Sequence, residues 1–249
     1  MKKIICILIL CFLSTALLAE TESITLTFSL EDFTFTKQNI YDVINSPQND
    51  NYVFTSGLGE PQLPLKMITL SIPTDNEISE AKIIHKEMQT VKGDFLLYPV
   101  QKPKVLSDES PVEFIGASPA VYGKSTMFPE HVAHITKSGF LSGYYLGSIL
   151  VSPFQYDALN KKLFFISELQ IELKYTESKK SSIEINQRSQ TAQTFLHDQI
   201  SKVIHNISEI YDPHIVHKEM RDDIYEYVII TADNFEGEFQ PLADWKTQN

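Results

Sequence analysis

The sequence predicts a mainly β protein: an antiparallel β-sandwich-like domain, followed by the first strand and helix of an α/β domain that remains incomplete. Three observations support this fold class. Short segments between Ile24 and Tyr175 alternate apolar with polar residues, which buries one face of each strand. Prolines lie at the ends of these segments. Strands this short, without helices between them, favour two packed antiparallel sheets over a parallel α/β sheet.

The first 19 residues have the pattern of a secretory signal peptide. Lys2 and Lys3 give a positive start, and an apolar run from Ile4 to Leu18 follows, which is short for a membrane-spanning helix. A small residue at Ala19 favours cleavage between Ala19 and Glu20. We therefore expect an exported, extracellular protein.

Composition excludes several classes of function. The only two cysteines, Cys6 and Cys11, lie in the signal peptide, so the mature chain offers no disulfide, thiolate metal site or cysteine nucleophile. The formal net charge is −11, and removal of Lys2 and Lys3 makes it more negative. An acidic chain without a basic stripe is a poor partner for nucleic acid or for an anionic membrane.

Residues 20–175 are predicted to form the β domain, beginning with a strand over Ser23–Leu30 that alternates strictly. The segment Lys66–Ile72 is a second strand, flanked by prolines, and Ile78–Met88 continues as part of a meander.

The clearest strands lie at the end of this domain. Tyr144–Val151 reads as one strand and Leu163–Tyr175 as another, with a turn at Asn160–Lys162 expected to join them as a hairpin. In the long strand, one face should carry four apolar side chains, namely Leu169, Ile171, Leu173 and Tyr175.

Composition changes after Tyr175. Residues 176–224 are predicted to be a polar linker, with a helix over Ala192–Ile210 that packs on the β domain. Residues 225–249 read as the start of a truncated α/β domain, with a buried strand over Tyr225–Thr231 and an amphipathic helix over Phe235–Trp245.

Three groups of residues together resemble a known family. Gly59-Glu60-Pro61-Gln62-Leu63-Pro64, with Ile72-Pro73 after the strand, is similar to the G-x-P-x-L-P … I-P pattern of the propeptide domain of gingipain-type cysteine peptidases. The run Gly143-Tyr144-Tyr145-Leu146-Gly147 resembles the second half of that domain. Tyr227–Thr231 with Pro241–Lys246 resembles the opening strand and helix of the peptidase domain that follows such propeptides.

The resemblance implies a secreted precursor whose prodomain masks the active site of the peptidase and assists its folding. The partner would be the cognate peptidase domain, in cis or in trans. No residue here matches the histidine and cysteine of the family's catalytic dyad, so no catalytic residue, metal or cofactor is expected. A free-standing exported β-sandwich that binds a protein or a glycan stays open as the alternative.

Relatives of this kind block their protease with a basic side chain placed in an acidic pocket. Lys124 and Lys137, each close to a glycine, are expected at loop tips and are the candidate inhibitory residues; ordinary surface lysines remain the other interpretation. Lys218 and Arg221 precede the peptidase-like strand and are candidate maturation cleavage sites.

Three further motifs have simpler explanations. The pairs His131/His134 and His214/His217 lack a third ligand, so we expect structural or surface histidines. Asn206-Ile207-Ser208 matches a glycosylation acceptor, but it lies on the predicted helix and carries no weight.

Overall fold

The computed structural model describes residues 21–48, 51–73, 75–104, 113–178, 185–186, 189–206, 210–211, 215–216 and 228–248. The predicted signal peptide, its Ala19–Glu20 cleavage point and the candidate cleavage residues Lys218 and Arg221 lie outside these residues. In the part of the chain that is described, no helix combines the length and the apolar character needed to cross a membrane.

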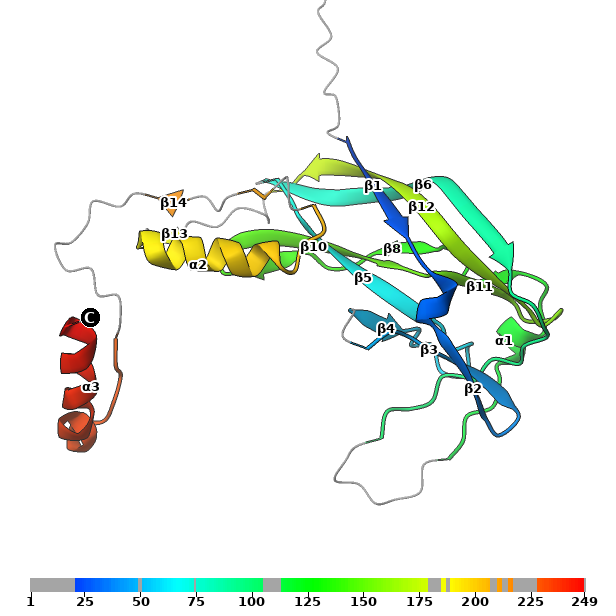
Figure 1. The fold of residues 1–249 in the computed structure, drawn as a ribbon, viewed down its shortest axis with the longest axis horizontal. Coiled ribbons are helices and arrows are strands. Elements are labelled where there is room, and N and C mark those ends of the chain that lie inside the picture. Colours follow the sequence, from blue (N-terminus) through cyan, green and yellow to red (C-terminus); the bar gives the residue numbers. More distant parts are fainter. Residues whose placement is uncertain are drawn as a thin grey trace, which may run out of the picture.

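Two five-stranded antiparallel sheets make up the body (Figure 1). The first sheet is built around the longest strand, β12, which pairs with β1 and β11 on one side and with β6 on the other; β7 pairs with β11. Its strands are β1 (Thr21–Thr27), β6 (Asn76–Thr90), β7 (Met127–Phe128), β11 (Phe154–Asp157) and β12 (Lys162–Glu177).

In the second sheet, β10 is central and pairs with β5 on one side and with β8 and β9 on the other. Its strands are β4 (Tyr52–Phe54), β5 (Pro64–Ser71), β8 (Ala133–Ile135), β9 (Gly139–Leu141) and β10 (Tyr144–Val151). Pro64 occupies the first position of β5, where the missing N–H removes no central ladder bond.

Shorter elements surround or follow the two sheets. Among them, β2 and β3 form a hairpin, and β13 pairs in parallel with β14. The set comprises η1 (Leu30–Asp32), β2 (Thr34–Gln38), β3 (Tyr41–Asn45), α1 (Pro119–Tyr122), β13 (Ile185–Asn186), α2 (Gln190–Ser201), β14 (Ile215–Val216), η4 (Asp233–Phe235) and α3 (Glu236–Gln248).

An aliphatic core fills the space between the two sheets. It takes Ile24 and Leu26 from β1, Ile68 and Leu70 from β5, and a row of side chains from β12. The prediction that one face of the long strand is buried is confirmed, because Leu169, Ile171, Leu173 and Tyr175 are at most 3% exposed.

A second, aromatic core lies against the opposite face of the first half of β12. At a bulge between Ile166 and Glu168 the odd-numbered residues of the strand change face: Leu163 and Phe165 before it belong to the aromatic core, whereas Leu169 and Ile171 after it belong to the aliphatic one. The Phe33 ring meets Phe154 edge-on with centroids 4.9 Å apart, a favourable aromatic geometry.

The mainly β, antiparallel class predicted from the sequence is confirmed, but one predicted pairing is wrong. The strands β10 and β12 are in different sheets, and β12 forms its hairpin with β11. Between β10 and β11, the chain crosses from one sheet to the other at Ser152 and Pro153, and the Ser152 hydroxyl donates to Phe154 O at 2.6 Å.

The C-terminal elements also differ from expectation. The helix α3 forms, but Val228–Thr231, the described half of the predicted strand, has no strand structure; Tyr225–Tyr227 lie outside the described residues. A strand needs a neighbour for its backbone hydrogen bonds, and none of the described strands pairs with this segment. Helix α2 ends at Ser201, nine residues before the predicted end of that helix at Ile210.

Candidate functional site

Lys124 lies in a loop whose backbone is fixed by the short helix α1. The loop turns at Gly123, whose N–H donates to Pro119 O at 3.1 Å, and the Lys124 N–H donates to Val121 O at 3.2 Å. A Cβ atom at Gly123 would lie 2.7 Å from Pro119 O, so this turn accommodates only glycine without rearrangement. The local sequence therefore determines where Lys124 is placed.

Tyr122 anchors the same loop to the aromatic core. Its hydroxyl donates to Leu97 O at 2.7 Å, and its ring meets Tyr156 edge-on at 6.2 Å. Burial raises the pKa of the Tyr122 hydroxyl far above its usual range, with smaller contributions from the neighbouring Tyr156 and Tyr41. Tyr122 therefore stays protonated, and keeps donating this hydrogen bond, at any physiological pH.

A polar cluster at the β11–β12 turn holds the other side of the loop. Asn160 Nδ2 donates to Asp157 Oδ2 at 2.8 Å and to Ser125 Oγ at 3.3 Å, and Ser125 Oγ lies 3.5 Å from Asp157 Oδ2. The hydrogen bond from Asn160 lowers the pKa of the Asp157 carboxyl. The Lys124 side chain itself is exposed and forms no ion pair with any described residue.

Lys137 has a different setting from the loop tip that the sequence predicted. Ile135 pairs with Ile149 of β10 and Gly139 with Leu146, so both Lys137 and Ser138 lie opposite the single residue Gly147. This is a β-bulge in the edge strand formed by β8 and β9. The tip of the hairpin lies further on, between β9 and β10, because those strands pair from Leu141 and Tyr144 outward.

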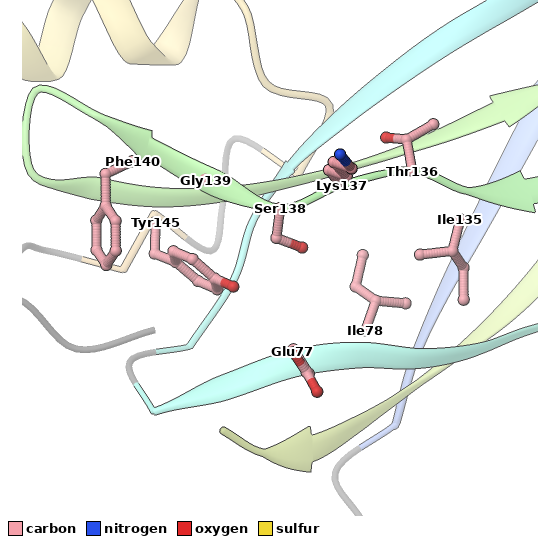
Figure 2. A pocket seen from close by; sticks show the side chains of 9 residues that line it. All are labelled: Glu77, Ile78, Ile135, Thr136, Lys137, Ser138, Gly139, Phe140 and Tyr145. Atoms are coloured by element: carbon pink, nitrogen blue, oxygen red, sulfur yellow. The ribbon is translucent and has the colours of Figure 1, made fainter. Parts of the chain in front are cut away.

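Lys137 borders a pocket of about 360 Å³ between the bulge and the start of β6 (Figure 2). The hydroxyl groups of Ser138 and Tyr145 point into it, and Ile78 lines its floor. Glu77 also lines the pocket, but it forms no ion pair with Lys137.

The two candidate lysines lie at opposite ends of β12. Lys124 is beside the turn that precedes β12, whereas Glu77, in the pocket with Lys137, pairs with Thr176 near the end of that strand. At about 3.3 Å per residue, a strand of this length separates them by on the order of 50 Å. The structure does not bring them together, so one acidic pocket can receive only one of them.

The histidine pairs show no metal geometry in the described residues. The rings of His131 and His134 are 6.1 Å apart and exposed, while His214 and His217 lie outside the described residues. Within those ranges, no three potential metal ligands come together.

Sequence reasoning did not identify the residues that hold the Lys124 loop. Tyr122 does so from the end of α1, and Asp157 and Asn160 do so from the β11–β12 turn. The spacing Asp157-x-x-Asn160 is typical of a turn stabilised by an aspartate side chain, and it was the available signal.

Comparison with known proteins adds an independent line of evidence. The sequence model of the family Propeptide_C25 matches residues 14–211, most of the chain. No curated protein matches this sequence.

Two solved structures from Porphyromonas gingivalis are similar. One, the complex of gingipain RgpB pro- and mature domains, is 16% identical with a TM-score of 0.58, covering 76% of this chain and 93% of that one. The other concerns the zymogenic latency of gingipain K; it is 14% identical with a TM-score of 0.47, covering 63% of this chain and 100% of that one. The first establishes a shared fold, and the family match establishes the identity: the chain belongs to the propeptide family of gingipain-type cysteine peptidases.

Proposed function

We propose that this propeptide keeps a gingipain-type cysteine peptidase latent by presenting Lys124 to an acidic specificity pocket, and that it assists folding of the peptidase. The observation that carries the proposal is an exposed lysine on a loop with three restraints. These are the Gly123 turn, the hydrogen bond from Tyr122 to the body, and the contact of Ser125 with Asp157. Family membership supports the class of partner, whether it is linked in cis or bound in trans.

The physical reason is preorganisation. A loop that already has its bound conformation loses little conformational entropy on binding, so more of the charge–charge attraction appears as affinity. The Lys124 ammonium has no intramolecular ion pair to break among the described residues, which removes another cost of transfer into a pocket. Lys137, in an edge-strand bulge, lacks such a projecting loop.

The remaining functional expectations belong to the same proposal. Residues 1–19 direct export and are removed before Glu20, and the mature chain then contains no thiol that could act as the nucleophile of a cysteine peptidase. Proteolysis after Lys218 or Arg221 separates the propeptide from a following peptidase domain. A severed propeptide still binds, because cleavage removes only the effective concentration that the tether provides.

The proposal is tested by adding residues 20–211 of this chain, as a separate polypeptide, to a gingipain-type peptidase that cleaves after lysine and measuring the inhibition constant. We expect Lys124→Ala to weaken inhibition by about 2–5 kcal/mol, roughly 30- to 5,000-fold in the inhibition constant, and the matched Lys137→Ala to leave it unchanged. Both variants should have the melting temperature of the unsubstituted chain.

Two results would contradict the proposal in different ways. An effect confined to Lys137→Ala would mean that the inhibitory residue is Lys137, at the other end of β12. No inhibition by the unsubstituted chain would favour the alternative of a β-domain that binds another protein or a glycan.

A further inference from the structure

One edge of β5 is only partly covered by a strand. β4 pairs with Pro64–Lys66, and Asn51 O accepts the Met67 N–H at 2.9 Å, but no described strand continues along the same side. The backbone groups of Thr69 and Ser71 that face this side would otherwise lack partners, although Ser71 is fully buried. Buried backbone groups without partners are costly, so this edge requires an occupant.

The segment after α2 fills this edge. His205 N–H donates to Thr69 O at 2.7 Å, and the side chain of Asn206 forms a paired contact with Ser71: Oδ1 accepts the Ser71 N–H at 2.9 Å, and Nδ2 donates to Ser71 O at 3.0 Å. The Asn206 amide thereby copies the backbone of a neighbouring strand. A fourth bond joins Tyr211 N–H to Ser71 Oγ at 3.0 Å.

Apolar packing holds the same segment to the body. Ile200 and Ile204 are buried against Tyr144 and Leu146 of β10, and α2 lies along that strand (Figure 1). Gln193 Nε2 donates to the Tyr144 hydroxyl at 2.9 Å. The attachment therefore has two independent parts, an apolar helix face and a polar contact at the edge of the sheet.

We infer that residues 189–206, together with the backbone of Tyr211, are a strap that belongs to the folded propeptide, with Asn206 as the positioning residue that closes the edge of β5. Through its hydrogen bond to Ser71, Tyr211 is the last strap residue attached to the body, and it is also the last residue of the family match. Cleavage after Lys218 or Arg221 would then leave the strap attached.

Asn206 is also unsuited to carry a glycan, because its Nδ2 is engaged with Ser71 and only 7% of the residue is exposed.

The inference does not depend on the inhibitory role and is tested by residue-resolved amide hydrogen exchange on the full mature chain. In Asn206→Ala, the amides of Ser71, His205 and Tyr211 should exchange at least about tenfold faster. The adjacent amide of Ile72 provides an internal control, because it donates to Tyr145 O of β10 and should keep its rate.

Asn206→Asp provides a second variant, because it keeps an acceptor for the Ser71 N–H but replaces the donor to Ser71 O with a carboxylate oxygen that repels that carbonyl. It should accelerate exchange at His205 and Tyr211 with a smaller effect at Ser71. Unchanged rates in both variants, or acceleration of the Ile72 amide as large as that of Ser71, would overturn the role of Asn206.

Discussion

The two halves of β12 are buried on opposite faces, and each half packs into a different hydrophobic core. The first half packs Leu163 and Phe165 into an aromatic core, beside the turn that holds the Lys124 loop. The second half packs Leu169, Ile171 and Leu173 into the aliphatic core between the sheets, beside the pocket that Lys137 borders. A single bulge after Ile166 separates the two halves.

This difference shows how one strand can position a binding loop at one end and contribute mainly to the stability of the fold at the other. Edge-on aromatic rings and tyrosine hydroxyls that donate to backbone carbonyls restrict orientation, so the first half favours a fixed loop. Aliphatic side chains pack without directional bonds, so the second half contributes mainly to stability. Mutations at equivalent positions in the two halves should therefore affect stability similarly and inhibition differently.

The largest expected effect comes from truncating one core residue in each half. Phe165→Ala should lower the free energy of unfolding by about 3–5 kcal/mol and Leu173→Ala by about 2–5 kcal/mol, because both side chains are buried. At a temperature where both variants remain folded, only Phe165→Ala should weaken inhibition. The ring centroids of Phe165 and Phe154 are 5.3 Å apart, and Phe154 is on β11, the strand that leads into the turn beside the Lys124 loop. Denaturant unfolding and inhibition constants measure the two quantities. Equal losses of inhibition would remove the distinction between the two halves.

An intermediate effect is expected at the glycines beside the two lysines. Gly123→Ala places a methyl group 2.7 Å from Pro119 O and must shift the loop, so we expect inhibition to weaken by about 1–3 kcal/mol. Gly139→Ala is the matched control at the other end, because nothing lies within 4 Å of its added Cβ. Inhibition constants for both variants make the comparison, and an equal effect of the two substitutions would argue against a preformed Lys124 loop.

The smallest effect concerns the stability at alkaline pH that comes from Tyr156, which pairs with Leu163 in the first half of β12. Burial raises the pKa of Tyr156 from 10.0 to about 12, with its hydroxyl donating to Phe95 O at 2.7 Å. Because the folded state has the higher pKa, this contribution is fully present below pH 10 and is lost as pH rises from about 10 to 12. Tyr156→Phe should flatten the fall in unfolding free energy over that range. Unfolding curves between pH 8 and 12 measure it; an unchanged slope would mean that other groups cause the fall.

The sequence by itself determined the class of fold, several strands and the family resemblance, because alternation and proline placement are local signals. Leu169 to Tyr175 could be assigned to one buried face from a period of two alone. The candidate lysines were also found in the sequence, but only as basic residues close to glycines. Nothing in the local pattern distinguished the Gly123 turn from the bulge at Lys137.

Tertiary structure decided which strands pair and which residues hold the site. β10 and β12 look like one hairpin in sequence, yet each finds its partners in a different sheet, because burial of both strands depends on segments far away in the chain. The contact between Asn206 and Ser71 joins residues 135 positions apart, and Tyr122 reaches a carbonyl 25 residues away. No local pattern encodes such bonds, because their partners lie far apart in the chain and meet only in the folded protein; each bond satisfies a group whose burial without a partner would cost about 1–3 kcal/mol.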